Sequence, residues 1–128
     1  MLIFGHPWVD SPRFRKIFTV EEISQVASEE IILLEPLSDS ITLVHDCRNN
    51  QRDFAVTVNS VTEALFANAL GSSYIICQHE DAQKIQQIAQ EYLFDTKVLT
   101  LTGSEKEIQK MAELSIDGVI FPAAIIQG

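Results

Sequence analysis

Short runs rich in Ile, Leu and Val recur along the whole chain, and longer segments of mixed polarity separate them. Each run has the length of a strand and is too short for a buried helix. Near-continuous apolar runs are typical of parallel strands that are covered on both faces. The pattern therefore predicts six strands, at residues 2–5, 31–35, 54–58, 73–77, 97–101 and 118–122.

The segments between these runs carry helical signals. In residues 80–94, Ile85, Ile88, Ala89 and Tyr92 share one face at helical spacing, which predicts a helix. Residues 39–50 predict another. Three further helices are expected where Ser or Thr is followed by Glu three residues later, the signature of a capping box. These pairs are Thr19 and Glu22, Ser60 and Glu63, and Ser104 and Glu107.

Two parts of the chain repeat each other. Residues 54–77 and 98–121 align without a gap, and each predicts strand, helix, strand. Residues 16–35 form a looser third copy. Strand–helix–strand connections are right-handed and give parallel strand pairs. The repeat therefore predicts an α/β protein with a mostly parallel sheet.

The predicted elements suit one domain over residues 1–128. We expect three layers, α/β/α, around an open sheet of about five or six strands, flavodoxin-like or Rossmann-like. A half (βα) barrel that dimerises is the alternative. A complete eight-unit barrel needs roughly 200 residues or more, so one chain of this length is too short to form it.

Residues 60–77 and 107–125 carry a further pattern, in which small residues and a glycine or Asp-Gly precede an apolar strand. The matching positions are Glu63, Ala64, Ala67, Gly71, Asp117, Gly118, Val119 and Ile120. This pattern resembles the βα units of phosphate-binding TIM barrels of the thiamine phosphate synthase and keto-deoxy-phosphogluconate aldolase type. Their glycine-rich phosphate elements are missing, because Phe121–Ile125 stands at that place, and the lysine that such aldolases need at a strand end is absent too. The resemblance implies a fold type and no activity.

The formal net charge of −9 changes the range of expected partners. It disfavours nucleic acids and anionic membrane surfaces, which bind through Lys and Arg. The start of the chain does not resemble a signal peptide, and no apolar run has the length of a membrane span. Cys47 and Cys77 show neither disulfide nor metal spacing, so we expect reduced thiols in a cytoplasmic protein and no metal or cofactor.

Residues 6–16, HPWVDSPRFRK, hold the only tryptophan, two of the four prolines and three basic residues. They lie in a long connection between the first predicted strand and the Thr19 helix. Connections in α/β proteins usually span roughly 2–6 residues, so we expect a functional loop at the carboxyl edge of the sheet. Arginines beside a helix N-terminus suit an anion. The candidate ligand-binding residues are His6, Trp8, Arg13, Arg15, Lys16, Ser60 and Ser104.

Each candidate also has a structural interpretation. Trp8 can fold back on the sheet while the cations pair with Asp10 and Glu21, and Ser60 and Ser104 can serve as caps alone. Cys77 and His79 could act as a nucleophile and its base. Alternatively, Cys77 is a buried thiol and His79 begins a helix. Glu35, before Pro36, suits either proton transfer or the end of a strand.

Three functions follow from these candidates. The first is a non-catalytic binding or regulatory module for a small anionic, phosphorylated ligand at the strand carboxyl edge. The second is a protein-interaction or homo-oligomeric module that uses residues 6–16. The third is a small enzyme that uses His6, Cys77 or His79, so whether the protein is an enzyme stays open.

Overall fold

A computed structural model describes residues 1–127 of the chain. Its strands form one sheet in which every neighbouring pair is parallel. The order across the sheet is β1-β7-β6-β5-β4-β3-β2-β8. The strands are β1 (Leu2–Phe4), β2 (Phe14–Lys16), β3 (Ile31–Leu34), β4 (Phe54–Thr57), β5 (Tyr74–Cys77), β6 (Lys97–Leu101), β7 (Gly118–Ile120) and β8 (Ile125–Ile126).

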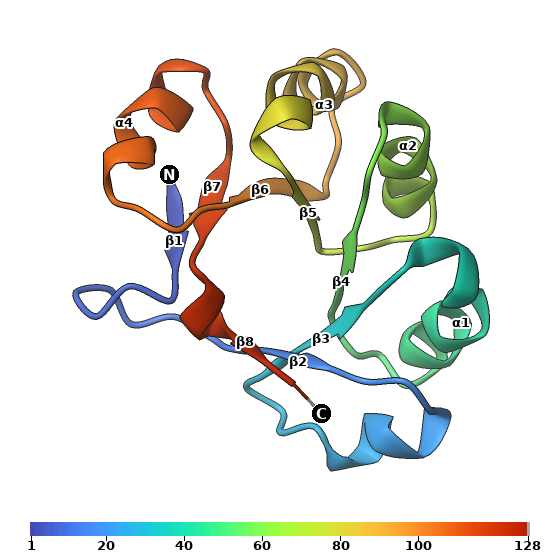
Figure 1. Ribbon diagram of the computed structural model, residues 1–128. Coiled ribbons are helices and arrows are strands. Elements are labelled where there is room, and N and C mark those ends of the chain that lie inside the picture. The colour runs from blue at the N-terminus through green and yellow to red at the C-terminus, as the bar shows by residue number, and fades with distance from the viewer. Residues whose placement is uncertain (128) are drawn as a thin grey trace.

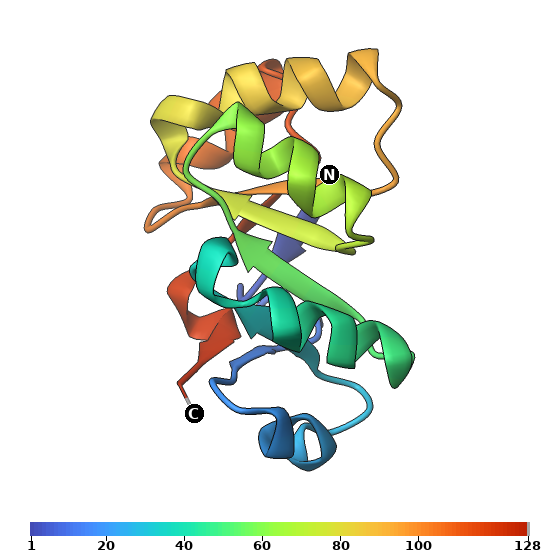
Figure 2. The ribbon, with the colours of Figure 1, turned by 90° about the vertical axis from the view of Figure 1, so that its right-hand side faces the viewer.

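The helices lie around the outside of this sheet, which curls strongly (Figure 1). The α-helices are α1 (Ile41–Asn49), α2 (Val61–Ala69), α3 (His79–Glu91) and α4 (Lys106–Glu113), and the short 3-10 helices are η1 (Val20–Gln25), η2 (Leu37–Asp39) and η3 (Pro122–Ala124). Figure 2 shows α1, α2 and α3 stacked along the convex side. None of the helices within residues 1–127 is long and apolar enough to cross a membrane.

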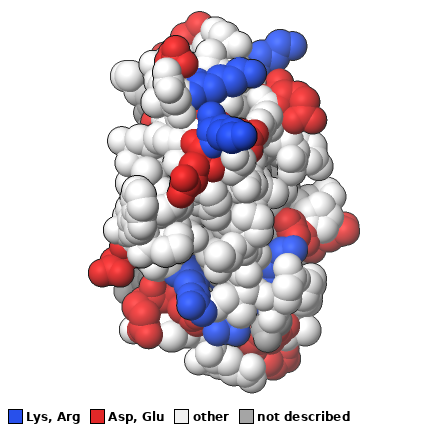
Figure 3. Space-filling model, turned by 60° about the vertical axis from the view of Figure 1, so that its left-hand side comes forward, with Lys and Arg blue, Asp and Glu red and all other residues white. Residues whose placement is uncertain are grey.

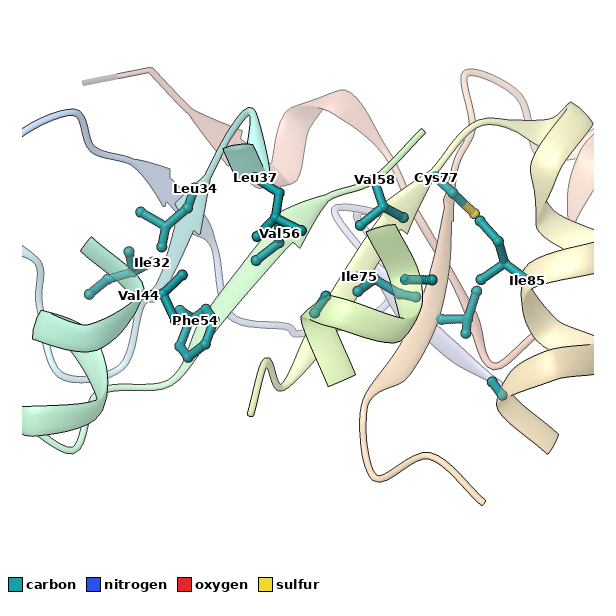
Figure 4. Packing of buried hydrophobic residues seen from close by; sticks show 14 of the residues in the cluster. Ile32, Leu34, Leu37, Val44, Phe54, Val56, Val58, Ile75, Cys77 and Ile85 are labelled. Atoms are coloured by element: carbon teal, nitrogen blue, oxygen red, sulfur yellow. The ribbon is translucent and has the colours of Figure 1, made fainter. Parts of the chain in front are cut away.

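Two separate cores hold the curled sheet together. On the convex side, helix residues such as Val44 and Ile85 pack against strand residues such as Phe54 and Ile75 (Figure 4). On the concave side, side chains from all eight strands meet, joined by Ala124 of η3: Phe4 of β1 contacts Phe14 of β2 and Tyr74 of β5, with ring centres 5.1 and 5.4 Å apart. These strands are not neighbours in the sheet, so their side chains can meet only because the sheet curls. Each fully buried aliphatic or aromatic side chain contributes about 1.5–3 kcal/mol.

The fold differs from the expected open sheet in two ways. The sheet has eight strands rather than five or six, and its concave face is filled by side chains instead of a second helical layer. The half-barrel that the sequence left as an alternative fits this arrangement. All six predicted strands are present, and the two additional ones are β2 and β8.

The N-terminal segment also differs from its prediction. Residues 14–16 of the expected loop form β2, which pairs with β3 and β8, and the helix after Thr19 is the 3-10 helix η1. Since all strands are parallel, the chain leaves β1 at the carboxyl edge and must enter β2 at the amino edge. The connection through residues 5–13 therefore crosses from one edge of the sheet to the other.

Candidate functional site

Three neighbouring strands present polar side chains on the concave side at their carboxyl ends. Each of these residues comes two positions after a residue of the concave core, and side chains two apart on a strand share a face. The polar residues are Lys16 after β2 residue Phe14, Glu35 after Leu33 of β3, and Thr57 after Ala55 of β4. These three side chains form a polar group at the carboxyl edge of the concave core.

The three side chains bond to one another. Lys16 Nζ lies 2.5 Å from Glu35 Oε1, and Thr57 Oγ1 donates to Glu35 Oε2 over 2.7 Å. The Lys16 and Glu35 side chains are 19% and 30% exposed, so ligand can still reach them. Burial raises the pKa of Glu35, but the hydrogen bonds from Lys16 and Thr57 outweigh it, and the net pKa is lower than usual. Glu35 is therefore ionised at neutral pH.

A hollow of about 310 Å³ opens beside this trio. Its walls are Phe18, Glu35, Pro36, Thr57 and Asn59. The Phe18 ring is 65% exposed and, with the ring of Pro36, supplies apolar surface to the hollow. We call this hollow the edge pocket. It combines an apolar wall with a carboxylate, a hydroxyl and a side-chain amide.

The backbone amides around the edge pocket already have internal acceptors. Glu22 accepts from the amides of Phe18 and Thr19 at 2.9 and 3.0 Å, and Glu63 accepts from the amide of Asn59 at 2.8 Å. The same device recurs after β6, where Glu107 accepts from Gly103. These are the glutamates of the three predicted capping boxes. Their carboxylates occupy the turn amides that a phosphate would need.

A second polar group lies further along the carboxyl edge. His79 Nδ1 is 2.6 Å from Glu107 Oε2, and Thr102 Oγ1 donates to Glu107 Oε1 over 2.6 Å. The hydrogen bond from Thr102 and the charge of His79 hold the pKa of Glu107 below its usual value. Cys77 is buried, and burial raises the pKa of its thiol to about 12. The thiol is therefore protonated at neutral pH and lacks the thiolate that a nucleophile requires.

The loop after β1 holds His6 and Trp8. His6 Nε2 bonds to Glu105, and His6 Nδ1 accepts from the backbone amide of Trp8 over 3.1 Å. Those roles suit the neutral tautomer that carries its proton on Nε2. The His6 ring also contacts Phe121 and Trp8 edge-on. The His6 side chain, 12% exposed, thus fixes the backbone position of an indole that is 87% exposed.

The predicted site residues do not all come together. Lys16 ends β2 at the carboxyl edge, where the sequence indicated no lysine, whereas Arg13 precedes β2 at the opposite edge, in a hollow with Asp10, Glu29 and Glu30. Arg15 forms a two-pronged pair with Glu30, with both N–O distances 3.0 Å.

The two serines of the predicted site are engaged in local hydrogen bonds. Ser60 accepts from the amide of Glu63, and Ser104 accepts from the amide of Lys106. Ligand contacts of these serines and of the arginines stay a prediction.

Phe18 and Thr57 are wall residues of the edge pocket that the sequence did not indicate as ligand contacts, whereas Asn59 belongs to a turn that the sequence offered for a phosphate. The sequence does contain a signal for part of this site. Glu35 and Thr57 each come two positions after a buried apolar residue of the same strand, so they point to the same face of the sheet. That signal gains meaning only when β2 is known as a strand that brings Lys16 alongside.

Within residues 1–127, no group of three or more His, Cys, Asp and Glu side chains is arranged to hold a metal ion. The resemblance to phosphate-binding barrel units stays a prediction. Comparison with protein-family models and with curated proteins gave no match for this chain.

Proposed function

We propose that the protein is a binding module that holds a small, uncharged, hydroxyl-rich ligand, such as a sugar or cyclic polyol, in the edge pocket. The observation that carries this proposal is the trio of Lys16, Glu35 and Thr57 beside a hollow of about 310 Å³.

The place of the pocket supports a binding role. In curled parallel sheets, ligands bind at the carboxyl ends of the strands, where loops meet and side chains from several strands converge. The edge pocket lies there, on the β2, β3 and β4 side. Lys16 and Glu35 are only partly buried there, so their polar atoms remain within reach of a ligand.

Electrostatics supports an uncharged ligand. Glu22, Glu35 and Glu63 lie at or next to the pocket, and Lys16 is the cation beside them. An added phosphate would face this excess of negative charge, and the nearby turn amides of Phe18 and Asn59 already donate to carboxylates. A neutral hydroxyl group carries no such penalty and can donate to Glu35.

The shape of the wall supports a ring with one apolar face. The exposed Phe18 ring and Pro36 offer contact to C–H groups, and Glu35, Thr57 and Asn59 offer hydrogen-bond partners at the rim. Hydrogen bonds to a charged group contribute roughly 1.5–3 kcal/mol each. Glu35 is therefore the expected main determinant of affinity.

Ligand-observed NMR tests the proposal. The probes are glucose, galactose and myo-inositol, each beside its monophosphate, so each pair differs only in the phosphate. We expect wild-type protein to bind at least one neutral member more tightly than its phosphate. Glu35→Gln should weaken this binding by about tenfold or more, equivalent to about 1.4 kcal/mol. Glu91→Gln, a matched change on the exposed end of α3, should leave it unchanged.

Two outcomes would contradict the proposal. Preference for the phosphates would favour the anionic ligand predicted from the sequence, with Arg13 and Arg15 as its contacts. Absence of binding by all probes would remove the sugar or polyol class.

A further inference from the structure

Trp8 stands out among the apolar residues of the surface. Its indole is 87% exposed, and its neighbour Val9 is 41% exposed. Tryptophan is enriched among the residues that contribute most of the binding energy at protein interfaces. Its backbone amide is fixed by His6, which is itself bonded to Glu105.

A groove of about 370 Å³ lies beside this indole. Its walls come from β1, the following loop and α4, and they are mostly apolar: Ile3, His6, Trp8, Val9, Glu105, Ile108 and Gln109. We call it the Trp8 groove. Glu105 is its one charged wall residue and is bonded to His6. The same chain therefore carries a projecting aromatic ring and an apolar groove next to each other.

The groove occupies an incomplete part of the fold. Strands β3, β4, β5 and β6 are each followed by an α-helix on the convex side, whereas residues 5–13 after β1 form a loop. The ring of helices is interrupted at this loop (Figure 1). Figure 3, which brings this side of the molecule forward, shows a wide uncharged area with charged groups above and below it.

We propose that two copies of this chain associate face to face through the Trp8 groove, with the indole of each copy entering the groove of the other. This interface is separate from the edge pocket and does not depend on the ligand proposed for it. Two-fold association requires one surface to be complementary to itself. A projecting ring beside a groove meets that requirement.

The ring and groove side by side are what identify a second copy as the occupant, and the uncharged surface around them limits the charge repulsion between the copies. Two chains of net charge −9 repel each other, so close contact is least costly where the surface is uncharged. Each inserted tryptophan would bury roughly 150–250 Å². Standard interfaces bury about 800 Å² per partner, so Met1, Leu2 and Val9, which are also exposed, would belong to the contact.

Sedimentation velocity on the purified chain over a micromolar concentration series tests the proposal. Wild-type protein should sediment as a dimer, and Trp8→Ala should lower the association constant at least tenfold. Because Trp8 is the only tryptophan, its fluorescence should shift to the blue as the protein concentration rises. Gln109→Glu, which adds a carboxylate on the exposed groove wall of both copies, should also weaken the dimer at least tenfold.

Two controls separate the groove from general surface effects. Tyr92→Ala removes a different exposed aromatic ring, and Gln87→Glu adds a charge on the exposed face of α3; both should remain dimeric. A monomeric wild-type protein throughout the concentration series would overturn the proposal. A dimer that Trp8→Ala and Gln109→Glu leave intact would overturn it as well.

Discussion

The edge pocket and the Trp8 groove are built in opposite ways. The pocket is formed largely by side chains at strand ends, and its polar groups bond to one another before any ligand arrives. The groove is formed by an edge strand, a loop and one helix, and its apolar surface has no cover within the described chain. Hydrogen-bonded polar groups suit selection of a small polar ligand, and uncovered apolar surface suits association. The two surfaces share no residue, so each should be removable without the other.

The largest effect is expected from a substitution that displaces β1, the strand that forms one wall of the Trp8 groove. A Cβ at Gly118 would lie 2.7 Å from Leu2 Cβ and from the Leu2 carbonyl oxygen, and 2.8 Å from Leu99 Cδ2. Gly118→Val should displace β1 from β7 and lower the free energy of unfolding by about 3 kcal/mol, the upper end for overpacking. Urea unfolding measures the loss, and sedimentation should show that the dimer is gone.

The edge pocket lies beside β2, β3 and β4, which do not pair with β1, although Phe14 of β2 contacts Phe4 of β1. Ligand affinity of the Gly118→Val protein, measured below the unfolding transition, should therefore fall less than its dimer association. Loss of both activities in a folded variant would show that the two surfaces are coupled.

A smaller loss of stability is expected from a substitution beside the edge pocket. Lys16→Met keeps the apolar stem of the side chain and removes the ammonium that faces Glu35, so a half-buried carboxylate loses a partner. We expect a loss of about 1–2 kcal/mol in the free energy of unfolding, reduced by partial solvent exposure. Ligand affinity should fall while the dimer persists. Lys84→Met on the exposed face of α3 is the matched control and should change none of these quantities.

Acid should produce the mildest and most selective change. The folded-state pKa of Glu35 lies below its ordinary value of 4.5, so its contribution to stability is complete above pH 4.5 and is lost as pH falls through the lowered pKa. Glu22 and Glu107 are shifted in the same direction by their hydrogen bonds.

Thermal unfolding from neutral pH down to about pH 3 measures this acid dependence. Glu35→Gln should flatten the decline, whereas Glu91→Gln should follow the wild-type curve. A wild-type melting temperature that does not fall below pH 4.5 would contradict the role given to these carboxylates.

The regular part of the fold could be predicted from the sequence because local signals agree there. Strands β3 to β7 are apolar runs, and the four α-helices lie where amphipathic spacing or a Ser and Glu pair indicated them. The glutamates at positions 63 and 107 do bond back to turn amides, although Glu63 reaches Asn59 and Glu107 reaches Gly103 rather than the cap residues themselves.

The remaining elements depend on contacts that are distant in sequence. Strand β2 is Phe14-Arg15-Lys16, which contains two charges and no apolar run, and it is stabilised by pairing with β3 and with β8 near the other end of the chain. The curl depends on rings of β1, β2 and β5 meeting across the concave face. Neither contact leaves a periodic signal, so the edge pocket that follows from them could not be located beforehand.

Mapping where a ligand binds shows whether the edge pocket holds an uncharged hydroxyl-rich ligand. Amide proton–nitrogen correlation spectra would be recorded during titration with the best neutral probe and, separately, with its phosphate. For the neutral probe we expect shifts at Phe18, Thr57 and Asn59, with the loop around Trp8 unchanged. Shifts that occur only with the phosphate and cluster at Arg13 and Arg15 would contradict it.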